Sequence, residues 1–214
     1  MQNLKIQIKY RRWVLKFMRT FILRARKGSV DPDKLKSSIG SDNHAEVIAH
    51  VVMNAFFISN DFRRDVELYI VLDSTDDFPR TVKLSSNDGL SISGFHEMAI
   101  LSVITHALTQ SRDIKKDEIQ NIARGVSVFG YGFEKLVSSM IDSRSIYLLD
   151  RKGDDIRGSV IEDNPVFVLS DHIPMPKNII KSFTRRGMKS VSLGKKMLFA
   201  SQCVVLINDQ LDRI

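Results

Sequence analysis

The chain has 214 residues, of which 43% are hydrophobic and 27% are charged, as in a globular domain with one sizeable core. It contains no run of about eighteen apolar residues and no signal-peptide pattern, so we expect neither membrane insertion nor export, and a cytoplasmic protein. The single cysteine, Cys203, excludes an intrachain disulfide and a zinc site built on paired cysteines.

The net charge of +7 is concentrated at the N-terminus. Residues 1–27 hold nine Lys or Arg and no acidic residue, which leaves 23 basic and 25 acidic residues in the rest of the chain. Such a segment can add affinity for nucleic acid phosphates, or it can be a simple appended tail. Because Met18 directly precedes the first predicted strand, we interpret residues 1–17 as a basic N-terminal extension and residues 18–214 as a single domain.

The first two thirds of the chain predict both strands and helices. Apolar residues in RTFILRAR predict a strand over 19–26, and helical spacing predicts a core helix after the polar loop that contains Pro32 and Gly40. The further elements predicted here are the core helix over 44–57, strands over 65–72 and 81–84, and helices over 95–108 and 131–141.

The last third predicts short apolar strands separated by helices. The strands cover 145–150, 165–171 and 189–193, with helices near 176–186 and over 201–212. This order is typical of βαβ units, so we predict an α/β fold with a mostly parallel sheet flanked by helices. Ligands of such sheets bind beyond the carboxyl ends of the strands, which are here the positions after Leu149, Leu169 and Leu193.

Two groups of residues have the chemistry of a hydrolase. Ser170, Asp171 and His172 are consecutive at the end of a predicted strand, so their side chains point in alternating directions and cannot form a proton relay. Cys203 would need a histidine close by to act as a nucleophile, and none is near it in sequence. A buried structural role for Cys203 is favoured, and a hydrolase is the weakest of the functional hypotheses.

Two glycine-containing segments have some features of binding loops. FGYGFEKL has Lys135 where a dinucleotide-binding loop would place its third glycine, and it predicts no strand-turn-helix unit, so we reject that interpretation. Asp154 and Asp155 follow a predicted strand, but the basic residues around them favour an exposed charged turn over a metal site. We predict no metal.

SNDFRRDVEL places Arg63 and Arg64 between a predicted helix and a predicted strand. Two arginines beside an aspartate could bind a phosphate and orient a base. The alternative is a surface turn in which the arginines pair with Asp61 and Asp65. Their spacing leaves both interpretations open.

At NAFFISNDFRRDVELYIVL the sequence resembles the TrmY family, which are tRNA pseudouridine N1-methyltransferases of the SPOUT superfamily. The resemblance continues in order through SIYLLDRKGDDI, NPVFVLSDHIP and VSLGKKMLFASQCVVLINDQLD, and it covers residues 18–214. It implies an α/β domain with a deep C-terminal trefoil knot, usually as a homodimer, with S-adenosyl-L-methionine bound inside the knot. By position, the cofactor contacts of the family correspond to residues of four segments: Leu149, Ser170, Ser192 with Leu193, and Cys203.

The activity that the resemblance implies is methylation of a pseudouridine nitrogen in RNA, with transfer RNA as the expected partner. Asp65 is the candidate for proton removal or for holding the base, and Arg63 with Arg64 for positioning the RNA. The chain departs from the family pattern on the substrate side, at Phe95 to Met98, at Val128 to Gly130 and at Phe199 to Gln202. We interpret it as a divergent bacterial member. The alternative of another class is a non-catalytic knotted dimer that binds RNA or cofactor.

Overall fold

The computed structural model describes residues 18–38, 40 and 44–213, so the predicted extension over residues 1–17 lies outside the described residues. The strands are β1 (Arg19–Ser29), β2 (Phe57–Ile58), β3 (Asp61–Phe62), β4 (Val66–Ser74), β5 (Arg80–Ser85), β6 (Ile119–Ala123), β7 (Val126–Phe129), β8 (Ile146–Asp155), β9 (Val166–Ser170) and β10 (Lys189–Ser192). The helices are α2 (Pro32–Ser37), α3 (His44–Phe56), α4 (Glu97–Gln110), α5 (Phe133–Met140), α6 (Lys177–Arg185) and α7 (Ala200–Leu211), with a short 3-10 helix η1 (Ile156–Gly158).

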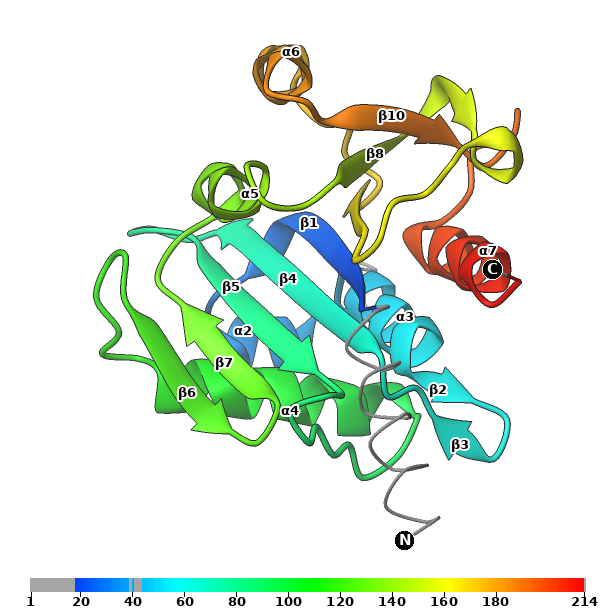
Figure 1. Cartoon of the computed structure of the whole chain (residues 1–214). Helices are drawn as coiled ribbons and strands as arrows, with labels where there is room; N and C mark the ends of the chain where they lie inside the picture. Colours follow the sequence, from blue (N-terminus) through cyan, green and yellow to red (C-terminus); the bar gives the residue numbers. More distant parts are fainter. Residues whose placement is uncertain (1–17, 39, 41–43, 214) are drawn as a thin grey trace, which may run out of the picture.

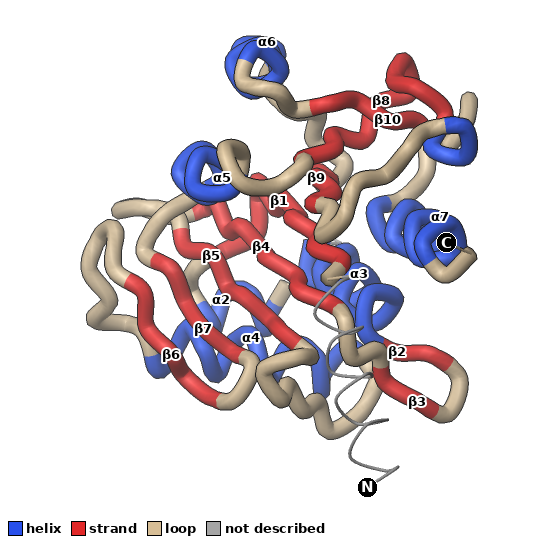
Figure 2. The backbone as a smooth tube through the Cα atoms, viewed as in Figure 1, coloured by secondary structure: helices blue, strands red, loops and turns tan. Residues whose placement is uncertain are grey.

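An eight-stranded sheet in the order β10-β8-β9-β1-β4-β5-β7-β6 forms the centre of the molecule (Figure 1). The strands from β10 to β4 run parallel, whereas β5, β7 and β6 pair antiparallel. A separate hairpin, β2–β3, follows α3 (Figure 2). The predicted α/β fold with a mostly parallel sheet flanked by helices is therefore confirmed. The knot stays a prediction.

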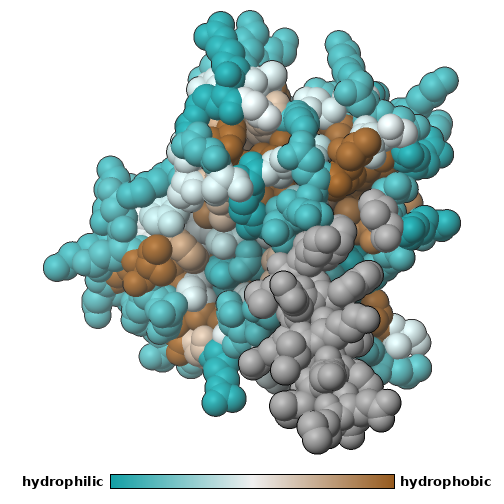
Figure 3. Space-filling view, viewed as in Figure 1, coloured by the Kyte–Doolittle hydropathy of each residue, from teal (hydrophilic) through white to brown (hydrophobic). Residues whose placement is uncertain are grey.

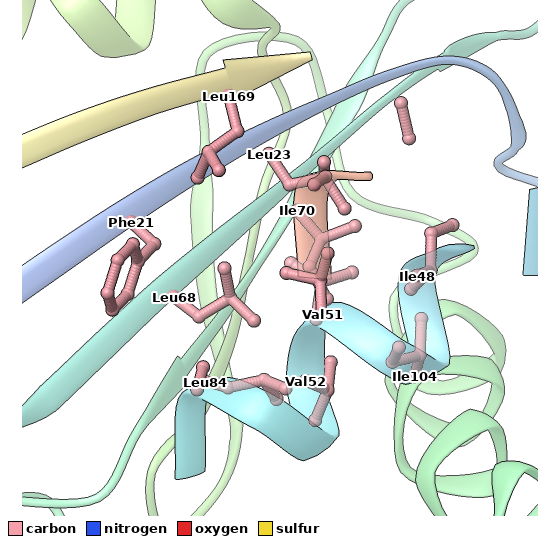
Figure 4. Close-up of a cluster of buried hydrophobic side chains, with 14 of the residues drawn as sticks. Phe21, Leu23, Ile48, Val51, Val52, Leu68, Ile70, Leu84, Ile104 and Leu169 are labelled. Atoms are coloured by element: carbon pink, nitrogen blue, oxygen red, sulfur yellow. The ribbon is translucent and has the colours of Figure 1, made fainter. Parts of the chain in front are cut away.

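Alternation along the central strands creates a separate core on each face of the sheet. Odd-numbered residues of β1, such as Phe21 and Leu23, pack in one cluster with α3, α4 and α7, part of which Figure 4 shows. Even-numbered residues such as Ile22 pack with α5 and α6 instead. Because both faces are covered, the central strands are apolar throughout, as is typical of parallel sheets.

The two outermost strands of the antiparallel edge, β7 and β6, were not predicted. β6 and β7 are short, and the exposed β6 offers little apolar pattern. β7, the turn after it and α5 form a strand-turn-helix unit, but it is not of the dinucleotide-binding type, because β7 pairs antiparallel with both of its neighbours. Gly130 has a packing role, since a Cβ there would lie 2.1 Å from the backbone oxygen of Lys115.

An ion-pair cluster joins the start of β1 to the C-terminal helix. The buried guanidinium of Arg19 donates to Asp65 (2.9 Å), to Asn208 (3.0 Å) and to Asp212 (2.8 Å). Arg63 binds both carboxylate oxygens of Asp212, at 2.8 and 2.6 Å. We call these five residues the Arg19 clasp. It fixes α7 to the amino ends of β1 and β4.

The clasp predicts how stability depends on pH. Burial alone would raise the pKa of Asp212, but the hydrogen bonds from Arg63 and Arg19 outweigh it and hold that pKa below its ordinary value. A lowered pKa in the folded protein stabilises it above the ordinary carboxyl range, and this stabilisation is lost as the pH falls through the folded-state value. We expect Asp212→Asn to lower the free energy of unfolding at pH 7 by about 1–2 kcal/mol. The loss is smaller than for a fully buried ion pair, because Asp212 is partly exposed and water screens its charge.

Urea denaturation followed by circular dichroism measures this effect. The difference from the unaltered protein should persist down to about pH 5 and shrink below about pH 4. Asp209→Asn is the matched control, because among the described residues Asp209 forms an ion pair only with the exposed Arg213, and the pair should contribute less than about 0.5 kcal/mol. Equal losses for the two variants would contradict the structural role of the clasp.

Candidate functional site

The carboxyl ends of β8, β9 and β10 lie next to one another, and β8 is interrupted there. Leu148 pairs with Ser190 of β10, but the next residue of β10 pairs with Asp154. The loop Leu149–Gly153 therefore leaves the ladder between these two pairs. The prediction that this strand ends near residue 150 is wrong, because β8 resumes and continues to Asp155.

Gly153 closes this loop tightly against β10. A Cβ at Gly153 would lie 2.6 Å from backbone atoms of both Ser190 and Val191, so a larger residue cannot occupy the position without moving the strand. The loop is thus anchored at its end. Its first residue, Leu149, lies where β8 runs beside the end of β9.

The turn after β10 is held by a side chain. The Oγ of the buried Ser192 accepts a hydrogen bond from the backbone N–H of Gly194 at 3.1 Å. Gly194 has a φ of 121°, which glycine adopts without strain, and no atom lies within 4 Å of the position of a Cβ. The backbone of this turn is therefore open to a ligand.

Three of the predicted cofactor residues pack against the same core. Leu149, Leu193 and Cys203 are half-buried against the cluster of α3, α4 and α7, so they provide apolar surface at the carboxyl ends of the strands. Burial raises the pKa of the Cys203 thiol to about 11. A protonated, half-buried thiol lacks the character of an activated nucleophile.

The residues at the end of β9 each have a different partner. Asp171 accepts hydrogen bonds from the backbone N–H groups of Arg26 and Ile173, both at 2.9 Å, and this fixes the loop to β1. The ring of His172 stacks on His44 at the start of α3, with 4.7 Å between centroids. The half-buried Ser170 ends the strand. This arrangement agrees with the expectation that the three residues form no triad.

A buried charged group beside Ser170 was not predicted. Arg24 lies opposite Ser170 in the β1–β9 register, donates to Asp73 at 2.8 Å and has its guanidinium 4.8 Å from the ring centroid of Phe133. Burial raises the pKa of Asp73 although Arg24 acts against the shift. The available signal was a charged residue inside the apolar strand FILRAR, which requires a buried partner.

The predicted RNA-binding and catalytic residues lie at the other end of the sheet. Asp65 directly precedes β4, and β1 pairs Arg19 with the first residue of β4 and Arg24 with Ser170. Five strand residues, or about 16 Å, therefore separate Asp65 from Ser170 within the chain. Arg63 and Asp65 belong to the Arg19 clasp, so the surface turn in which the arginines pair with Asp61 and Asp65 is not formed.

Arg64 differs from its neighbour. It is exposed, and within the described residues its side chain has no hydrogen-bonding or ion-pair partner. It is thus available to bind another molecule, whereas Arg63 is already engaged by a carboxylate.

A hollow of about 310 Å³ lies between α3 and α4. It is lined by Ala49, His50, Met53, Phe95, His96, Glu97 and Ile100. His50 contacts Glu97 at 2.9 Å, and the Nδ1 of His96 caps α4 by accepting the N–H of Ala99. His96 and Glu97, two of the positions at which the sequence departs from the TrmY pattern, therefore make structural contacts in this hollow.

Two other kinds of feature are absent from the described part of the chain. Within residues 18–38, 40 and 44–213, no helix is long and apolar enough to cross a membrane. Over the same residues, no three His, Cys, Asp or Glu side chains are grouped so that they could hold a metal ion.

Comparison with known proteins identifies a family. Residues 18–214 match the family model described as "Putative SAM-dependent RNA methyltransferase". Proteins from Vibrio atlanticus and Photobacterium profundum are each 44% identical over 195 residues, and one from Shewanella frigidimarina is 43% identical. All three comparisons cover 91% of this chain and 98% of the relative, and each relative is named "Putative pseudouridine methyltransferase".

A solved structure has the same fold. Archaeoglobus fulgidus Nep1 bound to S-adenosylhomocysteine superposes with a TM-score of 0.58, covering 92% of this chain and 98% of that one, at 10% sequence identity. At this identity the likeness concerns the fold alone. On the match over residues 18–214 and the relatives at 43–44% identity, the chain belongs to the family of S-adenosylmethionine-dependent RNA methyltransferases.

Proposed function

We propose that this protein transfers a methyl group from S-adenosyl-L-methionine to N1 of a pseudouridine in RNA. The observation that carries the proposal is the family match over residues 18–214, which includes the three strand ends where the candidate cofactor residues lie. The names of the relatives support pseudouridine as the target. Transfer RNA is the first class of RNA to test, and the cytoplasm is the expected compartment.

The residues at the strand ends fit an adenosine-containing cofactor. Leu149, Leu193 and Cys203 offer an apolar wall, while the loop Leu149–Gly153 and the open turn at Gly194 offer main-chain polar groups. When bound, S-adenosyl-L-methionine supplies a methyl group already activated by its positively charged sulfur. The chain then has to orient the reactants and exclude water, and orientation alone can contribute about 7–11 kcal/mol. We infer that the C-terminal knot gives these loops their fixed shape.

We retain Asp65 and Arg63 as candidates for proton removal and base positioning, with Arg64 as an RNA contact. Asp65 lies about 16 Å from Ser170 in the same subunit, which is too far for proton transfer. We therefore propose that they act on the site of a second subunit. This makes a homodimer part of the mechanism.

The outer face of α7 supports a homodimer. Phe199 and Leu206 lie seven residues apart, or about two helical turns, and form an apolar stripe on this face; Phe199 is 72% exposed and Leu206 41% exposed. α3 offers little apolar surface for an interface, because its apolar side chains at Val51, Val52 and their neighbours are buried within the chain. We propose α7 as the centre of a two-fold interface.

Methyl transfer should depend on the chemistry of N1. We expect tritiated methyl to enter an RNA stem-loop that contains one pseudouridine. The same stem-loop with uridine or with N1-methylpseudouridine at that position should stay unlabelled, because neither offers a free N1–H. Binding of the pseudouridine RNA without any label would favour the non-catalytic alternative. Equal labelling of all three RNAs would contradict N1 as the target.

Asp65→Asn separates catalysis from folding. If Asp65 removes the proton, the turnover rate should fall by about 10²-fold, while the affinity for S-adenosylhomocysteine, measured by calorimetry, is unchanged. If Asp65 only neutralises Arg19, the variant should unfold at a lower temperature and keep its turnover rate. The second result would overturn the catalytic assignment.

Cys203 should react slowly with thiol reagents. Its pKa of about 11 leaves little thiolate at pH 8, so alkylation by iodoacetamide should be slow, rise with pH and slow further when S-adenosylhomocysteine is bound. Mass spectrometry follows the reaction without ambiguity because the chain has one cysteine. Cys203→Ala should keep methyl-transfer activity. Cys203→Phe should overfill the site and lower the free energy of unfolding by about 1–3 kcal/mol. Fast alkylation at the same rate with and without S-adenosylhomocysteine would show that Cys203 does not line the pocket.

Subunit association can be tested at α7. Light scattering should give a dimer for the unaltered protein and a monomer for Leu206→Glu, because the variant places a charge in the apolar stripe. Ile119→Glu is the matched control, since Ile119 is exposed on β6 at the far edge of the sheet. A monomeric unaltered protein at micromolar concentration would contradict the interface.

A further inference from the structure

One side of α6 carries basic residues without partners. Lys177, Lys181 and Arg185 are spaced four residues apart, so their side chains form a row with Cβ atoms about 5–6 Å apart. All three are exposed, and within the described residues none of their side chains makes a hydrogen bond or an ion pair. We call these three residues the α6 basic stripe.

The opposite side of α6 is fixed to the protein. Phe183 is buried and its ring meets that of Phe133 of α5 edge-on, with 6.0 Å between centroids. Ile179 and Ile180 pack against the same cluster. Because its apolar side is already covered, α6 cannot insert that side into a membrane as an amphipathic surface helix would. Its free cations are left for an electrostatic contact.

The charge continues beyond the helix. Residues 177–199 contain seven Lys or Arg and no acidic residue. Arg186 and Lys189 are neutralised by Asp142 and Glu162, but the exposed Lys195 and Lys196 are not paired within the described residues. Figure 3 shows hydrophilic side chains projecting from the top of the molecule, where Figure 1 places α6.

The position of the stripe relates it to the site. Lys177 begins α6 two residues after Met175, whose sulfur lies 3.3 Å from Nη1 of Arg24. Arg24 in turn lies opposite Ser170. The stripe therefore starts at the carboxyl edge of the sheet and runs away from it along α6, on the face that carries α5.

We infer that the α6 basic stripe binds consecutive phosphates of the RNA substrate and guides the strand to the carboxyl ends of β8 and β9. This inference rests on the proposed function, because it assigns part of the RNA contact for the same reaction. It differs from the assignment to Arg63, whose guanidinium is already neutralised by Asp212. Phosphates are the expected partners because most hydrogen bonds between proteins and nucleic acids go to the phosphate and sugar backbone, and Lys and Arg are prominent among the donors.

The test is the salt dependence of RNA binding. Lys177→Gln, Lys181→Gln and Arg185→Gln are combined, and binding of a fluorescein-labelled stem-loop containing one pseudouridine is measured over a range of salt concentrations. Each phosphate contact contributes about 0.7–0.9 to the slope of log K against log salt, so the slope should decrease by about 2–3. At about 0.1 M salt the affinity should fall between roughly 10-fold and 100-fold. The KM for RNA should rise, with turnover and S-adenosylhomocysteine binding retained.

The control removes the same charge elsewhere. Lys34→Gln, Lys36→Gln and Lys116→Gln change three exposed lysines, two of them on α2, which packs on the opposite face of the sheet. The control should keep the slope of the unaltered protein, and thermal unfolding should show that both triple variants fold.

If the two variants bind RNA equally while methyl transfer is intact, the stripe inference is wrong and the proposed function stands. If the unaltered protein neither binds nor methylates the RNA, both fail. Loss of binding only to phosphatidylserine vesicles would assign the stripe to a membrane instead.

Discussion

The buried guanidinium of Arg19 is the constraint on which the arrangement of the chain depends. A buried charge is costly unless it is paired, and Arg19 obtains its carboxylates from the segment before β4 and from the end of α7. Two distant parts of the chain must therefore meet at the first residue of β1. The consequence for function is that α7 is held beside α3, which brings Cys203 to the carboxyl ends of the parallel strands.

Whether a cationic side chain is already paired with a carboxylate of the chain decides whether it remains available to bind RNA. Arg63 and Arg24 stand out in the sequence or lie near the site, but both are neutralised by aspartates within the chain. The α6 basic stripe does not stand out in the sequence, but among the residues that the structure describes its side chains have no carboxylate partner. Because RNA binding replaces counterions around phosphates, it requires cations that are exposed and unpaired. The ion pairs of the folded chain thus leave Arg64 at one end of the sheet, and the α6 basic stripe at the other, as the cations available for RNA.

The central strands and helices could be predicted from the sequence because burial on one or both faces leaves a periodic pattern, as in β4 and α3. β6 could not, since its exposed residues carry little such pattern. The loop Leu149–Gly153 was also missed, because its return to β10 depends on a close backbone approach at Gly153 that only the packed structure shows. In the same way, the pairing of Arg63 with Asp212 joins residues far apart in sequence, so the spacing of the arginines could not reveal it. Resemblance suggested the cofactor residues where composition and periodicity could not.

The departures from the TrmY pattern gain a physical meaning from the fold. His96 caps α4, the Oε1 of Gln202 accepts the N–H of Phe199 at the start of α7, and Gly130 permits a close backbone approach. Each changed position therefore supports local structure. A reaction whose donor is already activated requires mainly orientation and a shaped pocket, which backbone groups at strand ends can provide. The loss of individual polar side chains on the substrate side is consequently weak evidence against catalysis.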